Sequence, residues 1–170
     1  EDEVARLLAR HPGRLDWDAF AGLFEAIGLQ IVLGPGARDL KLADQLTAMM
    51  GEANRGKRRQ SRHFAPFYAR LGNALRYPLA GGLAMRASRT PATRQTRVQN
   101  QIPHWLFALK DTLAENTVRA LASILAHPAV LARVREALAD ADLATPAGLE
   151  RLPLLRGCVQ EAMRLWPTTP

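Results

Sequence analysis

The apolar residues of the chain recur at helical spacing from one end to the other. They stand three or four positions apart over residues 4–8, 16–32, 42–50, 64–75, 93–127, 128–138 and 154–165. His11-Pro12-Gly13 and Gly34-Pro35-Gly36 end the first two stretches. Two prolines and Gly81-Gly82 predict mostly loop over residues 77–91, with at most one helical turn, and we expect a turn or helix start at 145–148. No alternating strand pattern runs beyond a few residues, so the sequence predicts an all-α fold.

The longest periodic stretch, residues 93–127, contains polar positions of interest. Its apolar stripe follows spacings of four, three, four, three and four through Val98, Ile102, Trp105, Leu109, Thr112 and Asn116. Pro103 lies inside the stretch and should kink the helix or start a second segment. A threonine on such a stripe usually bonds to the carbonyl one turn earlier. The pattern alone therefore favours ordinary structural roles for Thr112 and Asn116, while Asp111 points away from the stripe.

The last predicted helix ends in Glu161-Ala-Met-Arg164-Leu-Trp-Pro. Glu161 and Arg164 are three positions apart and share one face, while Pro167 disfavours helical geometry at the residue before it. The pattern alone favours an exposed ion pair. Cys158, one turn earlier among apolar residues, is typical of a small buried hydrophobe rather than a nucleophile.

Composition is that of an ordinary soluble domain. The 170 residues are 48% hydrophobic, 23% charged and 6% aromatic. No apolar run is long enough to span a bilayer, and the opening Glu-Asp-Glu is unlike a signal segment, so we expect a cytoplasmic location and no membrane partner. The single cysteine cannot form an internal disulfide, and the four histidines lack metal-ligand spacing.

The net charge of +7 includes a basic run at Arg55, Lys57, Arg58, Arg59 and Arg62. One alternative is therefore a non-catalytic α-helical binding module that contacts nucleic acid or an acidic protein through Arg55–Arg62. No aromatic residue interrupts this run to stack on bases. The run is more typical of a solvated helix start than of a nucleic-acid site.

Five motifs in a fixed order carry a resemblance to a known family. They are Ala108-x-x-Asp111-Thr112, His127-Pro128, Arg133-Val-Arg-Glu136, Leu152-Pro-Leu-Leu155 and Glu161-x-x-Arg164 with Leu-Trp-Pro. This order resembles the cytochrome P-450 family, from its long central helix to its Glu-x-x-Arg helix. Residues 15–34 resemble the preceding helical region of bacterial members, so the resemblance covers nearly the whole chain.

The resemblance implies a fold, a cofactor and partners. Residues 1–170 would be the helical portion of the cytochrome P-450 fold, an incomplete part of one larger domain with one long central helix and the Glu-x-x-Arg helix at its C-terminal end. The complete protein would be a monooxygenase that uses haem b to insert oxygen into a small organic substrate. A ferredoxin or a reductase would supply its electrons.

The resemblance also implies roles for individual residues. Thr112 matches the threonine whose hydroxyl holds the bound oxygen species and a water, and Asp111 matches the acid that relays protons. Ala108 and Leu109 would line the oxygen groove. Glu161 and Arg164 match the pair that locks the haem core together with a downstream arginine.

Two features depart from the family pattern. Leu109 stands where members usually have a small residue, most often glycine, so it places a bulky side chain near the expected groove. The family's haem-ligating cysteine is also missing, because Cys158 precedes Glu161, on the wrong side of the motif. We therefore assign no metal ligand in this chain and do not expect it to hold a thiolate-ligated haem alone.

Overall fold

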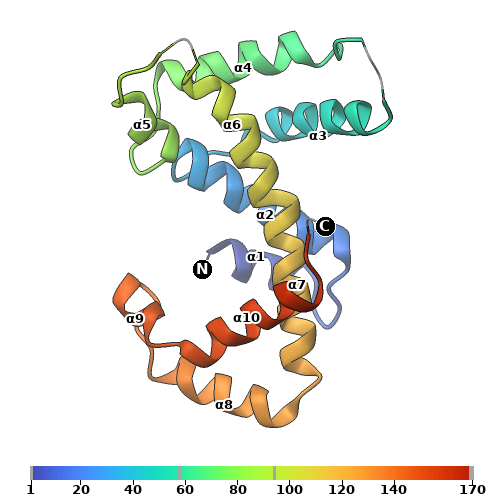
Figure 1. The fold of residues 1–170 in the computed structure, drawn as a ribbon, viewed down its shortest axis with the longest axis vertical. Coiled ribbons are helices and arrows are strands. Elements are labelled where there is room, and N and C mark those ends of the chain that lie inside the picture. Colours follow the sequence, from blue (N-terminus) through green and yellow to red (C-terminus); the bar gives the residue numbers. More distant parts are fainter. Residues whose placement is uncertain (1, 57–58, 94, 169–170) are drawn as a thin grey trace. The chain divides into compact units, whose positions relative to one another are not determined.

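A computed structural model describes residues 2–56, 59–93 and 95–168 (Figure 1). Every regular element in these residues is a helix. The predicted all-α class is confirmed for these residues. So is the long helix, which runs for 28 residues over Val98–Leu125. The chain forms two compact units, residues 1–111 and 112–170.

The first unit contains six α-helices. They are α1 (Asp2–Arg10), α2 (Trp17–Leu33), α3 (Leu40–Asn54), α4 (Phe64–Arg76), α5 (Leu83–Ser88) and α6 (Val98–Phe107). Asp16 caps α2, where its side chain accepts a hydrogen bond from the Ala19 N–H at 2.9 Å. Asp39 caps α3 in the same way and also accepts from Arg70 of α4 at 3.2 Å.

The core of the first unit is built from the apolar stripes of α2 to α6. Its most completely buried large side chains are Phe67, Leu29, Leu42, Leu71, Ile102 and Val32. Burial of a side chain of this size stabilises a fold by about 1.5–3 kcal/mol. These residues therefore fix the positions of α2, α3 and α6, which surround the candidate site.

Glu3 joins α1 to the rest of the first unit. Its Oε1 accepts hydrogen bonds from Arg6 at 2.8 Å, Gln30 at 3.0 Å and Arg38 at 2.7 Å. One carboxylate therefore connects α1 to α2 and to the segment before α3.

The long helix differs from its prediction at its start, since it begins at Val98, five residues later than expected. Of the two outcomes expected at Pro103, a second segment does not occur, because Pro103 lies inside α6. Proline removes the hydrogen bond to the carbonyl four residues earlier, and here that carbonyl lies in the first turn, where the loss disturbs little of the helix. The real departure from α geometry comes later, at Ala108.

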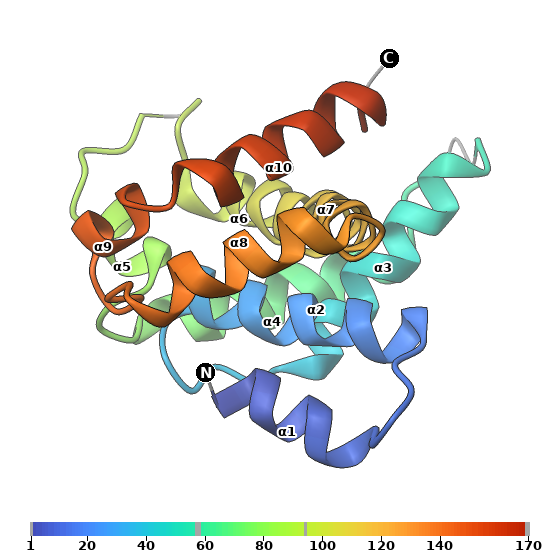
Figure 2. The same cartoon turned by 90° about the horizontal axis from the view of Figure 1, so that it is seen from below.

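The second unit contains α7 (Leu113–Leu125), α8 (Pro128–Ala139), α9 (Pro146–Glu150) and α10 (Pro153–Leu165) (Figure 2). Proline opens each of the last three helices, which is a favourable position for it. Helix α7 packs against α8 and α10, and the buried Ala120 and Ala162 belong to α7 and α10. Arg119 of α7 donates to the Trp166 carbonyl at 3.0 Å, which caps the end of α10.

Among the described residues, no single helix has the length and apolar character needed to cross a membrane. One bent pair, residues 98–125 with 128–139, meets that test by length and composition only.

Candidate functional site

The long helix widens into a π-helical turn at Ala108–Thr112, between α6 and α7. A π turn holds one residue more than an α turn, so it shifts the side chains that follow by about 100° around the axis. Such turns are rare and occur frequently at functional sites. All four residues assigned to the oxygen groove and proton relay, Ala108, Leu109, Asp111 and Thr112, lie in this one turn.

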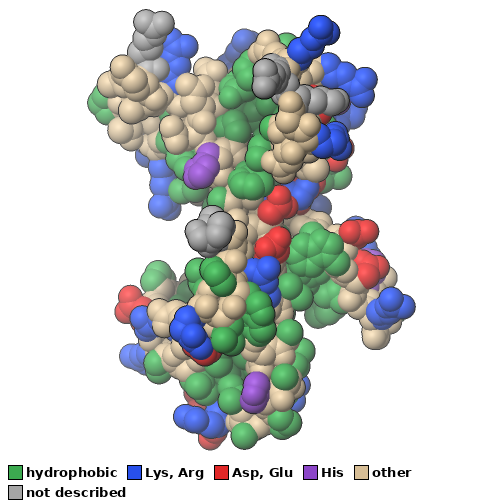
Figure 3. Space-filling model, turned by 45° about the vertical axis from the view of Figure 1, so that its right-hand side comes forward, with side chains coloured by type: hydrophobic (Ala, Val, Ile, Leu, Met, Phe, Trp, Pro, Cys, Tyr) green, Lys and Arg blue, Asp and Glu red, His purple; other side chains and the backbone are tan. Residues whose placement is uncertain are grey.

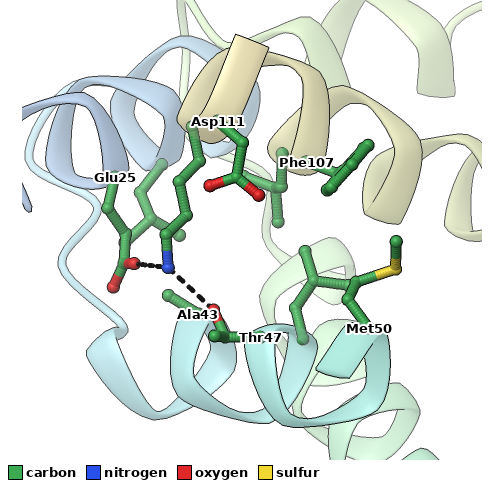
Figure 4. A pocket seen from close by; sticks show the side chains of 10 residues that line it. Glu25, Ala43, Thr47, Met50, Phe107 and Asp111 are labelled. Carbon is green, nitrogen blue, oxygen red and sulfur yellow. Dashed lines mark hydrogen bonds and ion pairs between the residues drawn. The ribbon is translucent and has the colours of Figure 1, made fainter. Parts of the chain in front are cut away.

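A small cavity of about 40 Å³ lies beside the π turn, within the first unit (Figure 4). Its wall is mainly apolar, with contributions from Leu29, Ala43, Leu46, Met50, Leu106 and Phe107. The Lys110 ammonium pairs with the Glu25 carboxylate at one side and donates a hydrogen bond to Thr47 Oγ1 at 2.7 Å. Asp111 also lines the cavity and is an exposed residue.

No sequence pattern pointed to Lys110, Glu25 or Thr47. Helical periodicity gives no sign of the partners of Lys110, because they come from two other helices. The ion-paired side chains of Lys110 and Glu25 are only 24% and 18% exposed. This is a partly buried polar contact between elements that are distant in sequence, and a single sequence carries no local signal for it.

Leu109 packs against α2. A Cβ placed on Gly28 of α2 would lie 3.3 Å from the Leu109 Cβ, so the missing side chain of Gly28 leaves the space that Leu109 uses. Leu109 is partly buried and lies against the core of the first unit. The bulky side chain expected near the groove is thus accommodated by a glycine on the neighbouring helix.

Thr112 does not satisfy its hydroxyl as expected. Thr117 and Ser123 of α7 donate to the carbonyls one turn earlier, of Leu113 at 2.7 Å and of Arg119 at 2.9 Å. The half-buried Thr112 makes no such bond to any residue that the structure describes, so the predicted back-bond is wrong here. The physical reason is the π turn, which changes the spacing between a residue and the carbonyl one turn before it.

Asn116 follows Thr112 by one turn and is a core amide. It is only 7% exposed, and its Oδ1 has no partner among the described residues. A buried carbonyl oxygen of this kind is a costly group that a donor such as water would satisfy.

Glu161 and Arg164 form an exposed, two-pronged ion pair. The Arg164 Nε–H and Nη2 atoms donate to the two carboxylate oxygens at 2.8 and 2.7 Å. The side-chain hydrogen bond to Arg164 lowers the pKa of Glu161, and the same bond raises the pKa of Arg164. Within the described residues the pair therefore has the geometry that the sequence pattern alone favoured. Its role in locking a haem core stays a prediction.

The exposure of this pair leads to a testable expectation. Glu161→Gln should leave the thermal unfolding midpoint of the 170-residue chain at neutral pH unchanged within error, because water screens the pair on both sides. The lowered pKa of Glu161 contributes stability above the unfolded-state pKa, and this contribution is lost as pH falls through the folded pKa, but in so exposed a pair it is too small to shift the midpoint. Melting curves from pH 7 down to 3 measure this; a clear loss at pH 7 would contradict the exposed placement.

An open groove of about 860 Å³ lies among α7, α8 and α10 of the second unit. Cys158, Leu154, Leu165 and Trp166 line it, together with Glu161. Cys158 is half-buried there rather than fully buried. Figure 3 shows how many hydrophobic side chains reach the surface of the described residues.

The basic run is only partly described. Arg55 caps the end of α3 and is exposed, as are Arg59 and Arg62, while Lys57 and Arg58 lie outside the described residues. The Arg62 Nε–H donates to His63 Nε2 at 3.2 Å.

The residues around the π turn do not by themselves fit a haem. No cysteine that could serve as a thiolate ligand is among the described residues that line the cavity beside the turn. The cavity of about 40 Å³ is also far below the roughly 300–1,000 Å³ of small-molecule sites. Any haem next to this turn must have its ligand and most of its pocket from elsewhere.

Comparison of the chain with protein-family models, with curated proteins and with solved structures finds no match. The assignment of function therefore depends on the ordered motifs and on the geometry of the π turn.

Proposed function

We propose that the protein containing this chain is a haem-dependent monooxygenase of the cytochrome P-450 family, with these residues as its central helical part. The observation that supports this most directly is the π turn. The ordered motifs assign Ala108, Leu109, Asp111 and Thr112 to an oxygen groove, and the helix leaves α geometry at those same residues. An ordinary core helix has no need of such a turn.

The side chains of the turn suit a proton-delivery role. The Thr112 hydroxyl is free of the back-bond that occupies Thr117 and Ser123, in the part of the chain that is described. It can therefore hold a water molecule or donate a hydrogen bond to an acceptor within its reach. The exposed Asp111 carboxylate can exchange protons with solvent and pass them on. The haem would supply the oxygen activation; since it does not fit these residues alone, we derive no step on it.

The substrate class and the donor follow from the same proposal. A small organic molecule would be oxidised, and a ferredoxin or a reductase would deliver the electrons. Nothing in the geometry of Arg55, Arg59 or Arg62 favours the alternative of a nucleic-acid-binding module.

Carbon monoxide binding to the complete, reduced protein tests the proposal. We expect the red-shifted Soret band that marks a thiolate-ligated haem, because the thiolate donates electron density to the iron. Cys158→Ser is the matched control and should retain the band, since Cys158 lies before the Glu161 motif and is not the ligand. Folded protein that gives no such band would rule out the monooxygenase assignment.

A further inference from the structure

Lys110 is the third of the five residues of the π turn, and its side chain leaves the turn to reach two other helices. It pairs with Glu25 of α2 and donates to Thr47 of α3 at 2.7 Å (Figure 4). All three residues belong to the first unit. A lysine on a solvent-facing helix position would instead carry its charge out into water.

A π turn needs support from tertiary contacts. The π-helix is rare and occurs mostly as a single turn inside an α-helix, so α geometry is the default that the turn must be held away from. Local strain persists only where the surroundings over-determine it. Leu109 supplies one such contact, through its packing at Gly28, and the ion pair of Lys110 supplies the polar one.

The same contact affects Asp111. Lys110 and Asp111 are adjacent in sequence, and side chains one position apart leave a helix in different directions. Glu25 and Thr47 fix the ammonium on the Lys110 side, and Asp111 has no ion pair to any residue in the described ranges. The carboxylate remains available to solvent.

We propose that Lys110, held by Glu25 and Thr47, is a positioning residue that maintains the π turn and keeps its own charge away from Asp111. The effect of Lys110 on catalysis rests on the proposed function, whereas its effect on the π turn does not. The anchor sets which way Asp111 and Thr112 face, because relaxation of the turn to α geometry would rotate the residues after it by about 100°.

Hydrogen exchange of the backbone amides of residues 109–116 tests the anchor without any haem. Lys110→Met should raise their exchange rates at least about tenfold, with the amides of α4 unchanged as an internal reference. Lys110→Arg should remain close to wild type, because a guanidinium can keep the pair with Glu25. Thr47→Val, which removes only the hydroxyl, should have a smaller effect.

A double variant separates the anchor from general damage. Glu25→Gln alone should mimic Lys110→Met, and the two together should exchange no faster than either alone, because both remove the same contact. Unchanged exchange in Lys110→Met, or effects that multiply in the double variant, would overturn the proposal. If Lys110→Met does not fold, Glu25→Gln and Thr47→Val still decide the question.

The complete protein supplies the functional arm. With the carbon monoxide band intact, Lys110→Met should lower product formed per electron consumed, while Lys110→Arg should restore it. If the wild-type protein lacks the carbon monoxide band, the proposed function is wrong, and the hydrogen-exchange test of the anchor remains valid. A normal band with unchanged exchange and unchanged yield would defeat the anchor alone.

Discussion

Gly34→Ala is expected to destabilise the first unit by about 3 kcal/mol or more, from two separate causes. Gly34 has φ 117° and ψ 162°, a region that is essentially restricted to glycine. A Cβ there would also lie 2.5 Å from the Leu79 Cβ. The backbone at Gly34 has little room to shift, since Gly82 also lies close to it and a Cβ on Gly82 would lie 2.6 Å from the Gly34 nitrogen.

Urea unfolding followed by far-ultraviolet circular dichroism measures this loss. Gly22→Ala is the matched control, because Gly22 lies inside α2 with no atom within 4 Å of an added Cβ. It should stabilise the chain by roughly 0.5–1 kcal/mol, the usual gain when alanine replaces glycine in a helix. If both variants unfold at the same urea concentration, the backbone conformation of Gly34 and its close approach to Leu79 are wrong.

The pair of glycines also shows what sequence can and cannot predict. Gly34-Pro35-Gly36 identified the end of α2, because these residues break helices wherever they stand. The same local reasoning read Gly81-Gly82 as a loop signal, whereas Gly82 is the N-cap of the short helix α5. Gly82 is also required for its close approach to Gly34, which is distant in sequence. No local sequence pattern predicts such a contact.

The residues of the candidate site also fall into those that the sequence identified and those that only the structure reveals. Asp111 and Thr112 were identified from their place in an ordered set of motifs, and Leu109 was recognised as unusual. The partner that makes room for Leu109 is Gly28, and the partners of Lys110 are Glu25 and Thr47. These come from α2 and α3, so only the packed structure brings them together. The π turn could not be predicted from the spacing of apolar residues either, because that spacing assumes 3.6 residues per turn throughout.

Thr112→Ala should have the largest functional effect in the complete protein. If Thr112 holds the proton-delivering water, the rate of product formation should fall by about 10²-fold and peroxide should take a larger share of the electrons, because a positioned proton donor is worth 10²–10⁴-fold in rate. Parallel assays of product, peroxide and reductant consumption measure how the electrons divide between product and peroxide. Thr112→Ser should keep most of the yield, since it retains the hydroxyl.

Thr112→Ala should reduce product formation without reducing the stability of the fold. A residue with a purely structural role would show the reverse. The Thr112 hydroxyl has no partner among the described residues, and alanine is the better helix former, so Thr112→Ala should not lower the unfolding midpoint of the chain. Thr117→Ala is the matched control in the same helix. It loses a real hydrogen bond to Leu113, yet it should leave the partition of electrons unchanged. Should Thr112→Ala instead weaken the fold and spare the yield, Thr112 would be a structural residue, and the π turn would need another explanation.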